Sequence, residues 1–580
     1  MISNREVAAA LSDLAALTLL AEGSPQAFRV RTYENAARSV ADAAEPVAGM
    51  SEKELTALRG IGRSTAAKIR EFVATGRIAK LDALRKEFPP AFRDLTRLPG
   101  IGPKTAVTLR DQLGIHDVDA LKAAIEQQEL RRLPGFGPKT EENIARAIDR
   151  LGLAGKERRT PLIEAIGVAR RVADAVAEIP GVLSAEPMGS IRRFRETIGD
   201  IDVLAVSEGP AEDVMERFVG LPIVADVIAY GGRKSAVLTH AGIQVDLRVV
   251  VPRQRGSAEM YFTGSKAHNI RLRQLAIEQG RTLSEYGLAD SETDEVIASA
   301  TEEEVYRALG LAWVPPELRE DRGEVEAAAA GTLPDVVEAG HLRGDLHVHT
   351  DLSGDGREGL DAMVAGAAAR GYEYLAITDH GEDLTLNGVT RDQLLAQRRE
   401  IEQLQGDHPG MRILQGCELN IAPDGTIDYD AGFLSGLDWG VASVHSAFDL
   451  DAAVQTARVV AAMENPAVNA IGHLTGRRIG RRPGIELDLE AVFDAAERTG
   501  TALEINCHLD RLDVSSDVLY AARERRVLFV ISTDAHHTTE LANTRWGAAT
   551  ARRGWVERER VVNTWPEARF GAWVEAKRAG

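Results

Sequence analysis

The chain has 580 residues, too many for one hydrophobic core, so we expect several domains. Charged residues make up 27% and hydrophobic residues 44%, and the sequence has no apolar run long enough to cross a bilayer, which excludes a membrane protein. The net charge of −19 argues against wholesale coating of nucleic acid, although a local basic surface is compatible with an acidic total.

The N-terminal residues, MISNREVAAALSD, lack the basic-then-apolar layout of a signal peptide. The two cysteines, Cys417 and Cys507, provide no disulfide framework, so a reducing cytoplasm is expected. Ten of the 13 histidines follow residue 340. This distribution predicts metal chemistry confined to the C-terminal part.

Residues 28–40, FRVRTYENAARSV, are predicted to begin an amphipathic helix. Three arginines stand in it beside Tyr33, and arginine with an interleaved aromatic ring suits a phosphate and a stacked sugar or base. A solvated basic helix face explains the same pattern equally well. Both interpretations stay open for this segment.

A loose repeat occurs three times in the first 150 residues: LRGIGRSTAAKI, LPGIGPKTAVTL and LPGFGPKTEENI. Each copy places Gly-x-Gly before a predicted helix, and Pro103 and Pro138 favour a helical first turn. One copy needs no more explanation than glycine's permissive φ in a turn. Three copies favour contact between a phosphate and the free N–H groups of a helix N-terminus. Such a loop cannot read bases, so the contact would be independent of the nucleic-acid sequence. The segments resemble helix-hairpin-helix motifs, the non-specific backbone clamps of many DNA repair proteins.

Residues 188–206, MGSIRRFRETIGDIDVLAV, place Asp200 and Asp202 at the start of a predicted strand. Their i, i+2 spacing puts both carboxylates on one side, where they repel unless a cation such as Mg²⁺ lies between them. Asp246, in IQVDLRVVV, lies in another apolar strand that can pair alongside. Three carboxylates with two Mg²⁺ ions make a clamp for phosphoryl transfer, and the preceding Gly-Ser and Arg-Arg pairs offer donors to a triphosphate.

GSIRRFRETIGDIDVL, VDLRVV and YFTGSKAHNIRLRQLAIEQG together resemble the family X DNA polymerases, of which vertebrate polymerase β is a member. The resemblance covers residues 1–322 in the family's order: lyase-like domain, fingers, palm and thumb. It implies that Asp200, Asp202 and Asp246 are catalytic and bind two Mg²⁺ or Mn²⁺ ions. It also implies nucleotide-binding roles for Gly189, Ser190, Arg193, Gly199, Tyr261, Phe262, Gly264, Asn269 and Arg273.

The same resemblance implies DNA contacts in the N-terminal domains, at Arg29, Tyr33, Gly60, Gly62, Lys68, Gly100, Gly102, Lys104, Gly135, Gly137 and Lys139. Lys68 falls where lyase members of the family carry a Schiff-base lysine. Ser64 replaces the family's second phosphate-binding lysine of the first hairpin, and Arg29 stands at another position of the 5′-phosphate pocket. These departures are compatible with 5′-phosphate binding and leave lyase chemistry open.

After a proline- and acid-rich segment, short apolar runs alternate with amphipathic helices such as residues 357–371. This alternation predicts a parallel sheet covered on both faces. The runs YLAITDH, RILQGCE, WGVASVH, NAIGH and VLFVISTDAH each end in a residue type that binds metals. The carboxyl ends of the strands are where an α/β barrel places its active site. In GDLHVHTDLSGDG, the H-x-H spacing puts both imidazoles on one face of a strand.

This arrangement resembles the polymerase-and-histidinol-phosphatase (PHP) domain, a distorted (β/α) barrel. The resemblance implies a three-metal site with nine ligands, and mixed nitrogen and oxygen ligation suits Mn²⁺ or Zn²⁺. Clustered ions of this kind activate water for phosphoester hydrolysis. The implied ligands are His347, His349, Glu418 and Asp534 for one ion; His445 and His473, with Glu418 bridging, for the second; and Asp355, His380 and His536 for the third.

The predicted fold class is multidomain α+β and α/β. The expected segments are a lyase-like helical domain (1–80), helix-hairpin-helix fingers (81–155), a nucleotidyltransferase palm (156–252), a thumb (253–322), a linker (323–340) and a PHP domain (341–575).

The resemblances together imply a polymerase that fills short gaps in base excision or end-joining repair, with a PHP-domain 3′-5′ exonuclease. Some relatives also incise at abasic sites. The expected partners are gapped or nicked double-stranded DNA and deoxynucleoside triphosphates. We expect a monomer in the cytoplasm that is associated with the nucleoid and does not bind a membrane. Two alternatives stay open: a PHP half that hydrolyses small phosphoesters, and a PHP half that serves only as a metal-bound scaffold.

Overall fold

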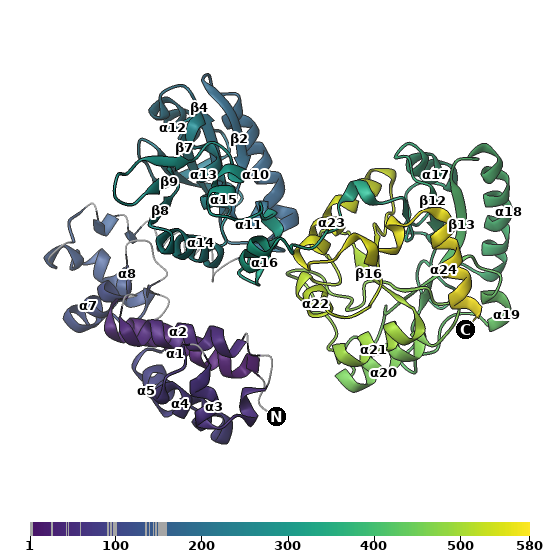
Figure 1. Cartoon of the computed structure of the whole chain (residues 1–580), viewed down its shortest axis with the longest axis horizontal. Coiled ribbons are helices and arrows are strands. Elements are labelled where there is room, and N and C mark those ends of the chain that lie inside the picture. Colours follow the sequence, from purple (N-terminus) through teal and green to yellow (C-terminus); the bar gives the residue numbers. More distant parts are fainter. Residues whose placement is uncertain are drawn as a thin grey trace. The chain divides into compact units, whose positions relative to one another are not determined.

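The structure, a computed structural model, describes residues 159–579 without a gap (Figure 1). The chain divides into two compact units, Met1–Arg158 and Arg159–Gly580. Gly100, Gly135 and Lys139, which were predicted to contact DNA, lie outside the described residues. None of the helices in the described part combines the length and apolar character of a bilayer crossing. Before residue 159 the described residues are 4–24, 27–41, 43, 46–58, 60–89, 92, 95–96, 101–133, 136–138, 140–142, 144–145 and 148.

The first unit is helical, as predicted. Gly60, with φ of +83°, turns the chain between α3 and α4, and Gly62 caps the N-terminus of α4. Pro103 occupies the first turn of α7 directly after the capping residue Gly102, which confirms the expected proline position. The helices are α1 (Asn4–Glu22), α2 (Phe28–Ala41), α3 (Glu52–Ala57), α4 (Arg63–Thr75), α5 (Ala79–Glu87), α7 (Pro103–Leu113) and α8 (Val118–Glu126).

The second unit begins with a five-stranded mixed sheet in the order β2-β4-β7-β6-β5. Its strands are β2 (Val182–Pro187), β4 (Ile201–Ser207), β5 (Val224–Ala229), β6 (Lys234–Thr239) and β7 (Gln244–Val250). Side chains alternate along β4, so Val203 and Ala205 face one side while Leu204 and Val206 face the other. The first pair packs with α10 (Leu162–Ala177) and α12 (Ala211–Val219), and the second pair packs with α13 (Arg255–Thr263).

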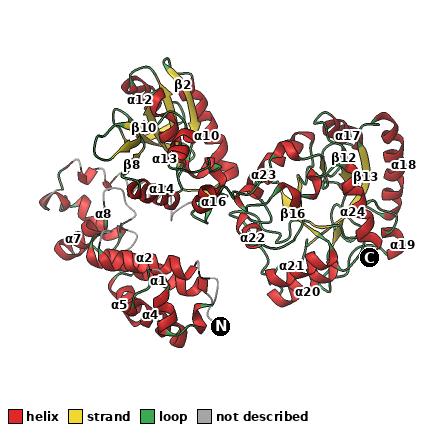
Figure 2. Ribbon diagram, in the orientation of Figure 1, coloured by secondary structure: helices red, strands yellow, loops and turns green. Residues whose placement is uncertain are grey.

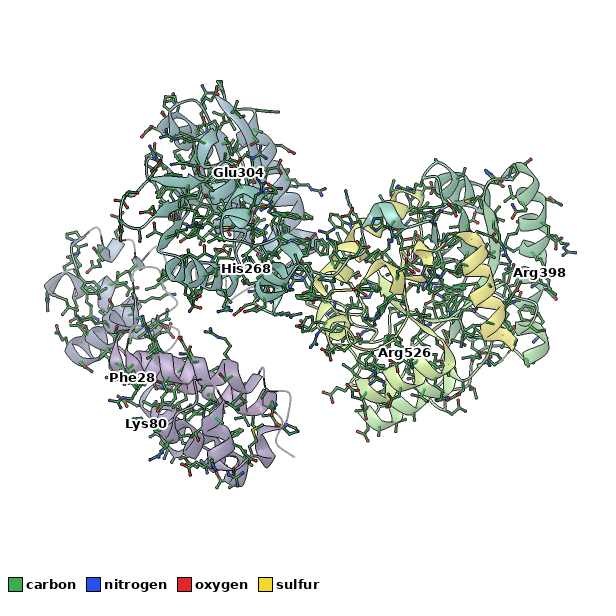
Figure 3. All side chains as sticks on the ribbon, in the orientation of Figure 1. Phe28, Lys80, His268, Glu304, Arg398 and Arg526 are labelled. Atoms are coloured by element: carbon green, nitrogen blue, oxygen red, sulfur yellow. The ribbon has the colours of Figure 1, made fainter. Side chains whose placement is uncertain are left out.

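A smaller subdomain follows the palm sheet. It contains α14 (Lys266–Glu278), the antiparallel strands β8 (Arg281–Ser284), β9 (Gly287–Asp290) and β10 (Val296–Ala298), and α15 (Glu302–Ala308). His268 of α14 is fully buried and bonds through its ring nitrogens to Glu324 at 2.6 Å and Tyr306 at 2.8 Å (Figure 3). Glu324 begins α16 (Glu324–Ala330), so part of the predicted linker is a helix packed on this subdomain.

The C-terminal part confirms the predicted barrel of parallel strands with helices around it (Figure 2). Seven strands pair in chain order, and a parallel bridge between Val348 and Ala535 links the segments that follow the first and last strands. The strands are β11 (Gly344–Asp345), β12 (Tyr374–Ile377), β13 (Arg412–Asn420), β14 (Trp439–Ser443), β15 (Ala470–Ile471), β16 (Ala502–Asn506) and β17 (Phe529–Ser532). The helices between and after them are α17 (Leu360–Ala368), α18 (Arg391–Asp407), α19 (Ala431–Leu434), α20 (Ala452–Met463), α21 (Leu489–Thr499), α22 (Ser516–Ala521), α23 (Thr544–Arg553) and α24 (Glu567–Ala579).

The palm and the barrel share apolar packing within the second unit. Leu512 and Trp546 of the barrel domain are buried in the same cluster as α10, α12 and one face of the palm sheet. Burial of apolar side chains from both segments stabilises their association, because it removes their surface from water. The two halves of this unit are therefore packed together and are not merely joined by a linker.

Candidate active sites

The three predicted catalytic aspartates lie together at one end of two parallel palm strands. Asp202 and Asp246 are paired directly across β4 and β7, and Asp200 immediately precedes β4. Because side chains alternate, Asp202 projects on the face of the sheet that α13 covers. The strand register thus brings together carboxylates that are 44 residues apart in the sequence.

The charges around these aspartates favour cation binding. Burial, then the charges of Asp200 and Asp246, raise the pKa of Asp202 to about 7. Burial and the charge of Asp246 also raise the pKa of Asp200. The Lys234 ammonium lies 3.3 Å from one Asp246 oxygen, and the Gln244 amide donates to the other at 2.7 Å. Carboxylates that lie this close and repel one another fit hard divalent ions.

A tight turn brings the predicted nucleotide-binding residues Gly189 and Ser190 against Asp202. Gly189 has φ of +59°, and a Cβ atom there would lie 2.2 Å from Asp202 Oδ2. The Met188 N–H donates to the Asp202 carbonyl at 2.8 Å, which fixes the start of α11 (Gly189–Arg192). Glycine is required at this position, and the turn sets Ser190 beside the aspartates.

A cavity of about 500 Å³ lies next to Asp200 and Asp202. All nine residues predicted to bind the nucleotide line it: Gly189, Ser190, Arg193, Gly199, Tyr261, Phe262, Gly264, Asn269 and Arg273. The Asn269 amide donates to the Tyr261 carbonyl at 2.7 Å, which ties α14 to α13. Their individual contacts with a nucleotide stay predictions. The sequence did not single out four further charged residues of this cavity: Arg159, Arg195, Lys266 and Glu320.

The nine predicted PHP ligands gather at the carboxyl ends of the barrel strands, around the buried carboxylate of Glu418. Seven of them line a cavity of about 370 Å³, whereas His347 and His349 are fully buried. Nitrogen atoms of five histidines lie near the Glu418 oxygens: His380 at 2.8 Å, His473 at 3.0 Å, His445 at 3.2 Å, His347 at 3.4 Å and His349 at 3.5 Å.

Ligand atoms lie close enough to share an ion in three groups: His347, His349 and Asp534; His380, Glu418 and His445; and His349, His380 and His536. Asp355 contacts the third group, with its Oδ2 atom 3.2 Å from His380 and 3.5 Å from His536. His349 and His380 thus each belong to two groups. The division of ligands among three ions, as the resemblance implies it, stays a prediction.

Hydrogen bonds orient the histidine rings for metal binding. His347 Nδ1 lies 2.7 Å from a Glu504 oxygen, and His445 Nδ1 lies 2.7 Å from the Asn420 side-chain oxygen. With Nδ1 as the donor in each case, Nε2 is left as a lone-pair ligand toward the cluster. The Nε2 atoms of His347 and His349 are buried without a hydrogen-bond partner among the described residues. Both observations fit a site that holds divalent metals.

Carboxylates and histidines of the cluster shift the pKa values of the histidine rings in both directions. Burial lowers the pKa of His380, but Glu418 and Asp355 outweigh it and raise this pKa to about 10. For His536, Asp355 and Asp534 likewise outweigh burial and raise the pKa to about 9. Burial and the nearby His380 lower the pKa of His349 to about 4. Bound metal ions would replace the protons that the carboxylates otherwise hold on these rings.

Three arginines of the same cavity were not among the predicted site residues: Arg357, Arg478 and Arg511. Arg478 pairs with Asp510, and Arg511 Nε lies 3.9 Å from an Asp534 oxygen. Guanidinium groups beside a metal cluster suit the phosphate oxygens of a phosphoester.

In the helical unit, the residues predicted for 5′-phosphate binding show mixed environments. Lys68 donates to the Ser64 hydroxyl at 3.0 Å and lies 5.8 Å from the centre of the Tyr33 ring. Tyr33 is only 7% exposed, so most of its ring belongs to the core. Arg29 is exposed and pairs with Glu22 at 3.0 Å. The neighbouring Phe28 is 84% exposed and offers the aromatic surface that one of the two open interpretations requires beside these arginines (Figure 3).

Comparisons with known proteins agree with this division of sites. Family models match residues 2–78 (helix-hairpin-helix domain), 92–150 (SAM-like helix-hairpin-helix tandem), 258–320 (DNA polymerase beta thumb) and 345–508 (PHP domain). The DNA polymerase/3′-5′ exonuclease PolX of Bacillus subtilis is 38% identical over 540 residues, which cover 92% of this chain and 93% of that protein. The chain belongs to the bacterial family X DNA polymerases with a PHP domain.

Other relatives cover about a third of the chain. A probable phosphatase of Caldicellulosiruptor saccharolyticus is 28% identical over 211 residues, covering 35% of this chain and 83% of the relative. A probable phosphatase of Acetivibrio thermocellus is 31% identical over 205 residues, covering 34% and 80%. These shorter proteins therefore resemble only about a third of this chain.

Sequence reasoning missed the residues that support the PHP ligands. Glu504 and Asn506 share one face of β16, and the Asn506 amide donates to Asp534 at 3.1 Å. Asp379 accepts hydrogen bonds from Thr350 and Ser353 and so fixes the loop that carries His349 and Asp355. A carboxylate inside the apolar run ALEIN was an available signal for Glu504, because buried carboxylates need partners.

Proposed function

We propose that this protein is a DNA repair polymerase that fills short gaps and shortens 3′ ends with its PHP-domain exonuclease. One observation supports the proposal: a single chain brings the three palm aspartates together in one place and the nine predicted barrel ligands together in another. No residue belongs to both sets. Polymerisation and hydrolysis are therefore separable activities.

In the polymerase site, Asp200, Asp202 and Asp246 would hold two Mg²⁺ or Mn²⁺ ions, which supply charge neutralisation for phosphoryl transfer when bound. Lys234 and Gln244 orient Asp246 from the neighbouring strand and its own strand. Ser190 and Arg193 donate to the triphosphate of the incoming deoxynucleotide. Its sugar lies against Tyr261, Phe262 and Gly264, and Asn269 and Arg273 contact the new base pair from the minor groove.

In the exonuclease site, the nine barrel ligands would hold up to three Mn²⁺ or Zn²⁺ ions, which supply an activated water and charge stabilisation when bound. Glu504 and Asn420 keep His347 and His445 in the tautomer that presents Nε2. Arg357, Arg478 and Arg511 bind phosphate oxygens of the strand that is degraded.

The helical unit holds gapped or nicked double-stranded DNA through its hairpins, and the protein acts as a monomer in the cytoplasm. Lys68 and Arg29 bind the 5′-phosphate of the gap, since Lys68 is a partly exposed cation of the first hairpin and Arg29 an exposed cation of α2. A lyase function of Lys68 is tested by borohydride trapping on a 5′-deoxyribose-phosphate end. Full trapping by a Lys68→Ala variant would exclude this lysine as the nucleophile.

One assay tests both activities. A primer labelled at its 5′ end and annealed in a one-nucleotide gap is incubated with Mg²⁺ or Mn²⁺, with and without nucleotides. We expect one-residue extension with nucleotides and stepwise shortening without them. A primer that neither grows nor shortens under any of these conditions would contradict the proposal.

A second candidate is favoured by the relatives named as phosphatases: the PHP half hydrolyses small phosphomonoesters. Competition distinguishes the two substrates. If DNA is the substrate, excess unlabelled single-stranded DNA inhibits hydrolysis of p-nitrophenyl phosphate, and labelled DNA is degraded at lower enzyme concentrations. Fast hydrolysis of the small ester with intact DNA would favour the phosphatase.

A further inference from the structure

Residues 193–196, which follow the predicted nucleotide-binding turn, connect the palm to the barrel domain through three of their four members. We call these four residues the anchor loop. Arg553 Nη1 donates to the Arg193 carbonyl at 2.5 Å. The Phe194 ring stacks on Trp546, with centroids 5.5 Å apart and an angle of 12° between the planes. Glu196 accepts two hydrogen bonds from Arg477, at 2.7 and 3.0 Å.

Arg553 also contacts Glu320, one of the residues that line the polymerase cavity. It is the last residue of α23, only 3% exposed, and its Nη1 atom also donates to Glu320 Oε1 at 3.0 Å. Arg193 Nε donates to that same oxygen at 3.0 Å. Glu320 therefore bridges a barrel arginine and the predicted triphosphate-binding arginine. Burial would raise the pKa of Glu320, but Arg553, Arg193 and Arg195 outweigh it and keep this pKa below its usual value.

The orientation of Arg193 depends on these few acceptors. Its Nη1 atom donates to the Thr263 carbonyl and its Nε atom to Glu320. The next residue, Phe194, has φ of +57°, a conformation that costs a non-glycine residue free energy unless its surroundings hold it. Stacking on Trp546 and the bond from Arg553 to the Arg193 carbonyl supply that restraint from the barrel side.

We propose that Arg553 is a positioning residue of the polymerase reaction: through Glu320 and the Arg193 carbonyl, it holds the Arg193 guanidinium where the triphosphate of the incoming nucleotide binds. The barrel domain thus completes the nucleotide site of the palm. This inference rests on the proposed nucleotide-binding role of Arg193.

Without Arg553, the Glu320 carboxylate has one fewer cation nearby and competes with the triphosphate for the Arg193 guanidinium. The Arg193 carbonyl also loses its hydrogen bond, so the anchor loop is less restrained on the barrel side. The triphosphate then binds to an arginine whose orientation is no longer fixed. Charge-assisted hydrogen bonds of this kind affect binding by about 10-fold to 100-fold when lost. We expect the change mainly in the KM for the nucleotide, because Arg553 lines neither the polymerase cavity nor the exonuclease cavity.

The test is single-nucleotide gap filling by the full chain, with kcat and the KM for the nucleotide measured separately. Arg553→Met removes both hydrogen bonds and the charge, and Arg553→Lys keeps the charge. Arg552→Met is the matched control, since Arg552 is adjacent on α23 but pairs with Glu317 and Glu338 instead. Arg193→Met reports on the proposed nucleotide role itself. Exonuclease rates of all variants show whether the barrel domain is intact.

We expect Arg553→Met to raise the KM at least about 10-fold with a smaller change in kcat, Arg553→Lys to recover part of the loss, and Arg552→Met to stay within about 2-fold of the parent protein. Exonuclease rates should be unchanged in the Arg553 variants. The inference is overturned if Arg193→Met raises the KM and Arg553→Met does not, or if both activities of the Arg553 variants fall together. An unchanged KM in Arg193→Met would instead refute the proposed role of Arg193.

Discussion

The hydrogen bond between Glu504 and His347 gives the most quantitative prediction for the exonuclease centre. Glu504 is 1% exposed, and its two oxygens serve different partners: one lies 2.7 Å from His347 Nδ1, and the other accepts the His473 N–H at 2.6 Å. The Asn506 side-chain amide also donates to this second oxygen, at 3.2 Å. Replacing Glu504 by glutamine removes the charge and leaves one acceptor oxygen for three donors. Either the His347 ring or the His473 backbone N–H then loses its hydrogen-bond acceptor, and both residues are predicted metal ligands.

The size of the effect follows from that lost bond. A charge-assisted hydrogen bond contributes about 1.5–3 kcal/mol, and loss of the partner of a metal-binding histidine lowers metal affinity about 10-fold to 100-fold. We therefore expect Glu504→Gln to weaken Mn²⁺ binding by that factor, with gap filling unchanged. Exonuclease activity should recover at high Mn²⁺ concentration.

Mn²⁺ titration of exonuclease activity, with calorimetry on the same samples, measures this change. Glu524→Gln is a suitable control, because Glu524 has an 81% exposed side chain and pairs only with its neighbour Arg523 among the contacts described. The reasoning would be refuted if Glu504→Gln and Glu524→Gln required the same Mn²⁺ concentration. Loss of gap filling together with exonuclease activity would indicate unfolding instead.

The remaining predictions concern Asp202, Arg478 and the helical unit. Burial and neighbouring charges raise the pKa of Asp202 from 3.8 to about 7, so the metal-free folded state binds this proton more tightly than the unfolded chain does. The free energy of unfolding should therefore fall as the pH rises from about 4 to about 7. Asp202→Asn should flatten this slope in thermal unfolding. Mg²⁺ should also support extension less well below pH 7, with an apparent affinity that falls about 10-fold per pH unit, and a pH-independent affinity would contradict this. Arg478→Met should raise the KM for DNA in the exonuclease assay with bound metal unchanged, whereas an unaltered KM would remove Arg478 from the substrate site. Deletion of residues 1–158, a separate compact unit, should weaken DNA degradation and lower its salt dependence while leaving hydrolysis of small phosphoesters intact. Equal degradation by the full chain and the shortened chain at moderate salt would show that residues 159–580 bind DNA without the helical unit.

Periodicity and strand-end residues predicted much of both centres. The i, i+2 spacing of Asp200 and Asp202 identified a shared strand face, and pairing of β4 with β7 then set Asp246 opposite Asp202. In the barrel, parallel strands bring their carboxyl ends to one edge, so ligands spread from His347 to His536 could be expected to meet.

Contacts that depend on tertiary packing were not predictable in this way. Glu504 bonds to a histidine 157 positions away, and no local pattern indicates that pairing. The link from Arg553 to the Arg193 carbonyl spans 360 positions and depends on how the palm packs on the barrel. For Tyr33, the arginines around it left two interpretations open, a ring that stacks on a nucleotide and a solvated helix face, and neither indicated that the ring packs in the core.

Separation of the two centres is the central claim, and one gel measures it most directly. The 5′-labelled primer in a one-nucleotide gap is incubated with the parent protein, Asp202→Ala and His349→Ala, with and without nucleotides. Asp202→Ala should shorten the primer at nearly the parent rate and extend it at less than a few per cent, because the paired carboxylates no longer hold metal. His349→Ala should extend the primer and leave it unshortened. Loss of both activities in either variant, or shortening that persists in His349→Ala, would contradict two independent centres.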